Sequence, residues 1–108
     1  MESDYYVVLV TLASISEAKS IATHLVNNRL AACVNILPKA VSIYWWEGAI
    51  EECREYLMLV KTRRDKLTLL EEEIHKLHSY EVPEIVALPI VEGSSEYLRW
   101  IDSSLNGN

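Results

Sequence analysis

The chain has 108 residues, half of them hydrophobic, and a formal net charge of −6 at pH 7. This length suits one domain spanning residues 1–108 with a single small core. The acidic balance argues against a nucleic-acid partner, and the lack of a long apolar run argues against a membrane span. Two cysteines without a basic and apolar leader predict a cytoplasmic protein with reduced thiols.

The N-terminal part predicts a strand followed by a helix. Tyr5–Ala13 is a nearly continuous apolar run rich in β-branched residues, which is typical of a strand buried on both faces. Ser14 and Glu17 then have the spacing of a capping box, and Asn27 and Asn28 end the helix. Between these signals, the apolar residues fall on one helical face: Ala18, Ile21, Ala22, Leu25 and Val26.

The middle of the chain predicts a long β-hairpin. Leu30–Trp46 is mostly apolar, and Pro38 inside it predicts a bulge or bend. Glu47 and Gly48 form a turn signal, and Ala49–Thr62 follows as the second strand.

The last third predicts a helix, a strand and a second helix. Arg63–Leu77 carries leucines and an isoleucine at helical spacing, and Glu84–Pro89 is typical of a short buried strand. The last helix begins near Gly93, with four residues expected to point inward: Tyr97, Leu98, Ile101 and Leu105. We expect the ends of the chain, Met1–Asp4 and Ser103–Asn108, to lie outside the folded part.

This order of elements predicts an α+β fold, the ferredoxin-like split βαβ sandwich with an extra C-terminal helix. Both main helices are expected on one face of a four-stranded antiparallel sheet. In Tyr6–Val10 and Tyr56–Val60 both alternating sets of side chains are apolar, so the second face is apolar too. Leaving each large apolar side chain in water forgoes roughly 1.5–3 kcal/mol. Either another copy of the chain covers that face, or the last helix covers part of it.

A few side chains are candidates for metal binding. His75 and His78 lie one helical turn apart and are either ligands as neutral imidazoles or residues that satisfy carbonyls at a solvated helix end. Cys33 is either a buried structural cysteine or a soft ligand for copper or zinc. Cys53, among charged residues, is expected to be exposed and without a role.

Glu84 stands at the start of a strand that we expect to be buried. A carboxylate there has to be paired, hydrogen-bonded or bound to a metal. The aromatic residues Tyr44, Trp45, Trp46 and Tyr80 are expected to serve in packing or in an interface. The sequence has no zinc-finger spacing, phosphate-binding loop or Ser-His-Asp pattern, so no enzyme class is predicted from motifs.

Several segments taken together resemble a known family. They occur in this order: Leu30-Ala-Ala-Cys-Val-Asn-Ile36, Ser42-Ile-Tyr-Trp-Trp-Glu-Gly48, Glu55 through Thr62, His78-x-Tyr-x-x-Pro-Glu-Ile85 and Tyr97-Leu-x-Trp-Ile101. With this order and spacing the chain resembles the CutA divalent-cation-tolerance family, and the likeness runs from about Tyr6 to Ile101.

The resemblance implies a homotrimer of ferredoxin-like subunits, built like the PII signalling proteins, with a link to copper and other divalent metal ions. It also implies clefts between subunits. Carried over to matching positions, the metal donors would be Cys33, His78 and Glu84. The residues that line or shape the cleft would be Tyr44, Trp46, Glu47, Lys61, Tyr80 and Trp100. The sequence departs from the family at Ser79, where proline is more usual, so the loop is expected to be less rigid.

Three functions are therefore open. The first is a trimer that binds copper or a similar ion and contributes to metal-ion tolerance, for which the acidic surface is favourable. The second is a PII-like signalling or scaffold trimer that binds a small molecule or a partner protein in its clefts. The third is a hydrolase with His78 and Glu84 as acid and base. The resemblance implies no reaction, so we expect a protein that is not an enzyme.

Overall fold

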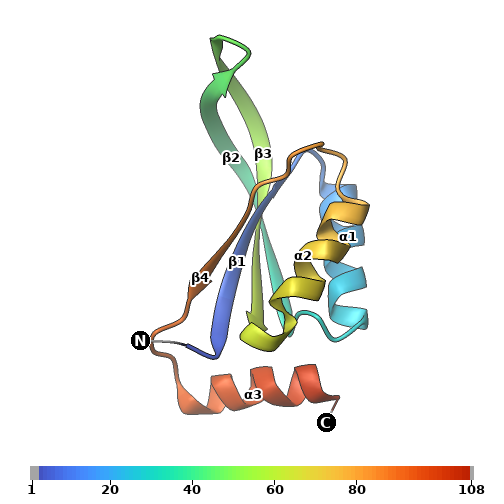
Figure 1. The fold of residues 1–108 in the computed structure, drawn as a ribbon, viewed down its shortest axis with the longest axis vertical. Coiled ribbons are helices and arrows are strands. Elements are labelled where there is room, and N and C mark those ends of the chain that lie inside the picture. Colours follow the sequence, from blue (N-terminus) through green and yellow to red (C-terminus); the bar gives the residue numbers. More distant parts are fainter. Residues whose placement is uncertain (1–2, 108) are drawn as a thin grey trace.

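A computed structural model describes residues 3–107. They form an antiparallel four-stranded sheet in the order β2-β3-β1-β4. Helices α1 and α2 lie on one face and α3 lies across one end (Figure 1). The elements in chain order are β1 (Tyr5–Leu12), α1 (Ile15–Asn27), β2 (Cys33–Trp46), β3 (Ala49–Arg63), the 3-10 turn η1 (Arg64–Lys66), α2 (Leu67–Leu77), β4 (Ile85–Pro89) and α3 (Ser95–Asn106). This arrangement confirms the predicted α+β ferredoxin-like fold.

The main core lies between the sheet and the two helices that cover it. Alternate side chains of β1 and β3 point toward α1 and α2, and both helices turn their apolar stripes to meet them. The largest fully buried side chains of this core are Val8, Val10, Leu12, Ile21, Leu25, Met58, Val60, Leu70 and Ile74. The predicted stripe of α1 is confirmed except at Val26, which lies at the border of the stripe and is exposed.

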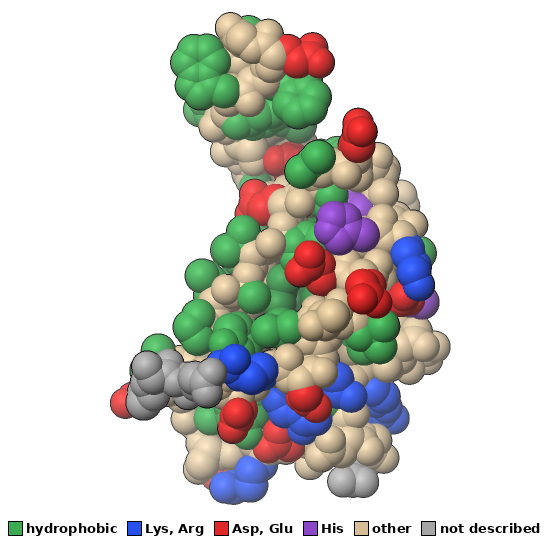
Figure 2. Space-filling view, in the orientation of Figure 1, with side chains coloured by type: hydrophobic (Ala, Val, Ile, Leu, Met, Phe, Trp, Pro, Cys, Tyr) green, Lys and Arg blue, Asp and Glu red, His purple; other side chains and the backbone are tan. Residues whose placement is uncertain are grey.

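Strands β2 and β3 extend beyond the other elements as a hairpin arm, here defined as residues 40–56 (Figure 1). A shift in register between Leu37 and Ala40 confirms the bulge predicted near Pro38. Figure 2 shows apolar side chains gathered at the end of the arm. The large apolar residues exposed on the arm are Val41, Ile43, Tyr44, Trp45, Trp46 and Ile50.

The strand predicted at 84–89 is present as β4, but the expectation that it is buried is wrong. β4 pairs with β1 at the edge of the sheet, and the side chains of Val86 and Leu88 are 45% and 43% exposed. Its apolar composition comes from lying on a sheet face that this subunit leaves partly uncovered. Glu84, just before the strand, is therefore exposed rather than buried.

The expected unstructured tail is also shorter than predicted. α3 continues through Asn106 and ends at Gly107, whose φ of 81° provides the left-handed cap that glycine favours. The guanidinium of Arg29 donates to the carbonyl of Ser104 at 2.9 Å, which holds this end of the helix. Of the residues expected outside the fold, Met1, Glu2 and Asn108 lie outside the described part of the chain.

The face of the sheet turned away from α1 and α2 is here called the open face. α3 covers one end of it, where Ile101 and Leu105 pack with Ala32 and, half-buried, Tyr5. The other large apolar side chains of this face are half-buried or exposed: Val7, Leu9, Leu37, Leu57, Leu59, Val86 and Leu88. The prediction that the last helix covers part of the second face is thus confirmed for one end.

A charged contact joins α1 to α2 and predicts how stability depends on pH. His24 Nε2 lies 2.8 Å from Glu73 Oε1, and the Lys76 ammonium donates to Glu73 Oε2 at 2.9 Å. These hydrogen bonds, that of His24 first, lower the pKa of Glu73. The folded pKa is below the unfolded value of about 4.3. The contribution to stability is therefore present above pH ~4.3 and lost as the pH falls through the folded pKa.

We therefore expect Glu73→Gln to lower the free energy of unfolding near neutral pH and to have a smaller effect in acid. Urea unfolding of both proteins over a series from about pH 6 to about pH 3 measures this. Glu72→Gln changes an exposed neighbour on the same helix and is the control. A difference between Glu73→Gln and the wild type that stays constant down to pH ~3 contradicts the prediction.

Candidate functional site

His78 lies at the C-terminal end of α2 and is held by both of its ring nitrogens. The side chain is buried, at 8% exposure. Its Nδ1 accepts a hydrogen bond from the backbone N–H of Tyr80 at 3.0 Å, so the proton of the neutral ring is on Nε2. That nitrogen donates to the carbonyl of Thr11 at 2.7 Å. The ring therefore ties the loop after α2 to the end of β1.

The loop after His78 is fastened a second time, to α1. The carboxylate of Glu17 accepts hydrogen bonds from the backbone N–H of Ser79 at 2.7 Å and from its hydroxyl at 3.1 Å. The predicted capping box is thus only half formed: Ser14 Oγ caps the N–H of Glu17, while the Glu17 carboxylate binds the loop. A proline at position 79 could not donate the first bond. Ser79 therefore fastens to Glu17 a loop that we expected to be less rigid.

Tyr80 connects this loop to the open face. Its ring lies 4.8 Å from the imidazole of His78, and its hydroxyl donates to Glu55 Oε2 at 2.8 Å. Burial first, and then the hydrogen bond to Glu55, raises the pKa of Tyr80. Tyr44 is 43% exposed, and partial desolvation first, followed by the nearby Cys53 and Glu55, raises the pKa of its phenol. We call His78, Tyr80, Glu55 and Tyr44 the histidine-end group.

Cys33 belongs to a different group of side chains at the other end of the open face. It is the cross-strand neighbour of Lys61. The Cys33 thiol lies 4.0 Å from Asn35 Oδ1, which also accepts a hydrogen bond from the Lys61 ammonium. On α3, Tyr97 lies beside Cys33, and burial first and then this thiol raise the pKa of the phenol. The ring of Trp100 stacks on Tyr97 at 5.5 Å. These five residues are here called the thiol-end group.

The two groups do not meet within one subunit. Lys61 of the thiol-end group and Glu55 of the histidine-end group are six residues apart on β3, which is roughly 20 Å of strand. Trp46 and Glu47 lie still farther away, at the tip of the arm. Over residues 3–107, no three His, Cys, Asp or Glu side chains come close enough to hold one metal ion. A single subunit thus does not bring the predicted donors Cys33, His78 and Glu84 together.

Several residues of these groups were not predicted from the sequence. Glu55 is 7% exposed and is the carboxylate at the centre of the histidine-end group. Glu55 shares a sheet face with Leu57 and Leu59, because the three are two residues apart along the strand. A charge on this apolar face could have indicated that Glu55 has a buried role. Asn35 gave no such signal, because its partner Lys61 comes from β3. Tyr97 was expected to point inward, but it is 41% exposed and lies beside Cys33 of β2.

The two groups offer different chemistry. The thiol-end group presents a half-buried, free cysteine with amide and ammonium neighbours, and a thiol is a donor that copper and zinc prefer. The histidine-end group presents the buried carboxylate of Glu55, which accepts a hydrogen bond from the Tyr80 phenol. Among the described residues, α1, α2 and α3 are all too short or too polar to cross a bilayer.

Comparison with known proteins places the chain in a family. A family model described as CutA1 divalent ion tolerance protein matches residues 6–104. The divalent-cation tolerance protein CutA of Thermus thermophilus is 54% identical over 95 residues, covering 88% of this chain and 92% of that protein. The chloroplastic CutA 1 of rice is 43% identical over 98 residues, covering 91% of this chain and 55% of that protein, so the chain spans about half its length.

Solved structures agree with this result. The structure of the periplasmic divalent cation tolerance protein CutA from Archaeoglobus fulgidus matches with a TM-score of 0.91 and 44% identity. The match covers 94% of this chain and 98% of that one. The chain belongs to the CutA1 family of divalent ion tolerance proteins.

Proposed function

We propose that this protein is a homotrimer that binds copper or a similar divalent ion in clefts between its subunits and contributes to metal-ion tolerance. The family supports the link to divalent ions. The observation that carries the binding site is the thiol of Cys33, which is free and half-buried beside Asn35 and Lys61. A thiolate suits copper and zinc better than magnesium or calcium.

The proposed trimer follows from surfaces that a single subunit leaves in water. The open face carries seven large apolar side chains that are half-buried or exposed, and the hairpin arm carries more. Burying a fully exposed side chain of this size contributes roughly 1.5–3 kcal/mol, and these partly buried side chains would each gain a part of that. Summed over the face, the gain is large against a net stability of about 5–15 kcal/mol for a whole domain. Association is also what can bring donors from different ends of the sheet into one cleft, as in a PII-like trimer.

The three proposed donors are unequal. Glu84 is exposed and Cys33 is half-buried, whereas His78 would first have to give up the hydrogen bond to Thr11 or the one from Tyr80. We therefore propose Cys33 as the principal donor, with Glu84 and His78 completing the site where subunits meet. The same engagement of both His78 nitrogens supports a binding protein rather than an acid–base enzyme.

Calorimetric titration with Cu²⁺ and Zn²⁺ under anaerobic conditions tests this function. We expect Cys33→Ala to weaken binding by more than about tenfold. Cys53→Ala, which removes the other thiol, should leave the affinity unchanged. Equal metal uptake by the wild type and by a Cys33→Ala/His78→Ala double variant would overturn the proposed donors.

A second function is favoured by one observation, the absence within residues 3–107 of three metal-binding side chains close together. It is the PII-like signalling or scaffold trimer, whose clefts bind a small molecule or a partner protein. Thermal unfolding screened against metals and against metabolites separates the two. A rise in Tm with metabolites alone favours this second function.

We further propose a cytoplasmic location. Both cysteines are free, which is the usual state in a reducing compartment. The names of two relatives give other locations for those proteins, the chloroplast for the rice protein and the periplasm for the archaeal one.

A further inference from the structure

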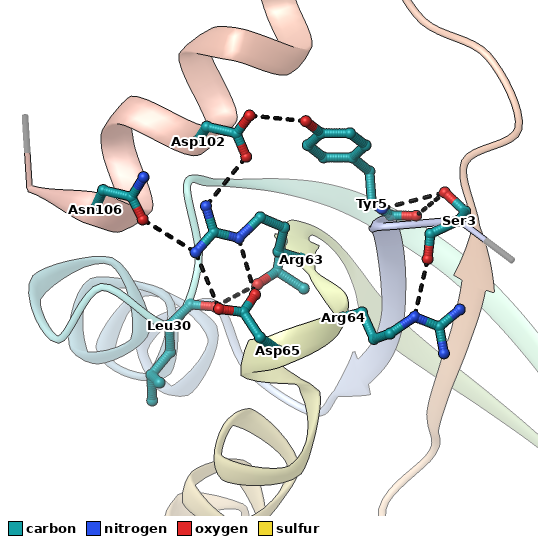
Figure 3. A network of polar contacts seen from close by, with 9 residues as sticks. Ser3, Tyr5, Leu30, Arg63, Arg64, Asp65, Asp102 and Asn106 are labelled. Carbon is teal, nitrogen blue, oxygen red and sulfur yellow. Dashed lines mark hydrogen bonds and ion pairs between the residues drawn. The ribbon is translucent and has the colours of Figure 1, made fainter.

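A carboxylate of α3, that of Asp102, binds the ends of two neighbouring strands at the end of the sheet. Figure 3 shows Asp102 of α3 between the first residue of β1 and the last residue of β3. Its Oδ2 accepts a hydrogen bond from the Tyr5 hydroxyl at 2.7 Å, and its Oδ1 accepts one from the guanidinium of Arg63 at 3.1 Å. One turn later, Asn106 accepts a second hydrogen bond from Arg63 at 3.1 Å. Both oxygens of Asp102 are therefore used to hold the helix in place.

Arg63 is held in position for this contact by a second carboxylate. Its Nε and Nη2 donate to the two oxygens of Asp65 at 2.8 and 3.0 Å. Asp65 lies in η1 and belongs to the body of the fold. The guanidinium is thus held on the body, with Nη1 directed toward Asp102 (Figure 3).

The apolar contact beneath α3 is small and separate from the main core. Two buried side chains of the helix, Ile101 and Leu105, pack with Ala32, and Tyr5 and Leu98 border them. A helix of 12 residues is marginal in water by itself. The polar contacts of Asp102, together with those from Arg29 to Ser104 and from Arg63 to Asn106, therefore have a large share in keeping α3 on the sheet.

What α3 covers is the region around Cys33. Ala32, which packs against α3, is the residue before Cys33. Tyr97 lies beside the Cys33 thiol, and the ring of Trp100 stacks on the ring of Tyr97. A helix that left the sheet would take the Tyr97 ring away from the thiol, together with the Trp100 ring that stacks on it.

We propose that α3 is a strap, fastened by Asp102, whose docking controls access to the thiol of Cys33. Local opening of elements with small cores is a general property of folded proteins. This inference deepens the proposed function, because Cys33 is its principal metal donor. The strap itself depends only on the contacts of α3, so it can be tested without any metal.

The test is the rate at which a thiol reagent modifies Cys33 in the assembled protein. Cys53→Ser in every variant leaves Cys33 as the single reporting thiol. We expect Asp102→Ala to raise the rate about tenfold, the effect of losing a charged hydrogen bond on an opening equilibrium. Asp102→Asn should raise it less, because the amide oxygen can still accept from Tyr5. Glu96→Gln makes the same acid-to-amide change at an exposed position of α3 and should not alter the rate.

A second reporter separates local opening from general loosening. In a Cys33→Ser background, modification of Cys53, far along the hairpin arm, should be unaffected by Asp102→Ala. Equal Cys33 rates in all variants would overturn the strap, and so would equal acceleration of both cysteines. If the rates follow the prediction but no metal binds, the strap stands and the proposed metal function fails.

Discussion

Leu88→Asp is expected to break the oligomer into monomers, while Leu69→Asp is expected to leave it intact. The two leucines are similarly exposed in a single subunit, at 43% and 50%. Leu88 lies on the open face, as the cross-strand neighbour of Val7, whereas Leu69 lies on the outer side of α2. If another copy covers the open face, only the aspartate at position 88 is buried without a partner, and such a charge costs about 3–5 kcal/mol.

Size-exclusion chromatography with light scattering measures the outcome as molar mass. Leu59→Asp, on β3 of the same face, should act like Leu88→Asp. The melting temperature of the wild type should rise with protein concentration, since association stabilises the folded state. A monomeric wild type, or full-size oligomers of all three variants, would contradict a self-associating open face.

Most of the fold could be predicted because its signals are local. The residues that form the apolar stripe of α1 lie within a few positions of one another. Glu47 and Gly48, which form the turn, are adjacent. The bulge near Pro38 follows from a residue without an N–H. The burial of β4 was predicted wrongly for a different reason. A short apolar run has the same composition in a buried central strand and in an edge strand on an open face, and only the packing of other elements distinguishes the two.

The candidate site could be predicted only in part, because its contacts cross the sheet. Spacing along the chain placed His78 beside Tyr80, but Glu55 reaches that pair from β3. The anchor of Ser79 is Glu17, 62 residues away. The same limit applies to Cys33 and His78, which only the family resemblance grouped together. Their separation depends on strand register, which the sequence pattern does not specify by itself.

His78→Ala is expected to lower the free energy of unfolding of the metal-free protein by about 2–4 kcal/mol. The imidazole is buried, and its removal leaves the carbonyl of Thr11 and the N–H of Tyr80 without their partner. Each unsatisfied buried group costs about 1–3 kcal/mol. The substitution also frees the loop that positions the Tyr80 hydroxyl on Glu55, so the loss is expected to extend to the open face.

His75→Ala is the matched control, three residues earlier on α2, because its side chain is 50% exposed. Its cost should stay within about 0.5 kcal/mol, as for most surface substitutions. Urea unfolding at one protein concentration and with a chelator present compares the two. An equally small loss in both would mean that the ring of His78 is not held by Thr11 and Tyr80. It would then be free to bind a metal, so this measurement also decides whether His78 acts as a structural tie or as an available donor.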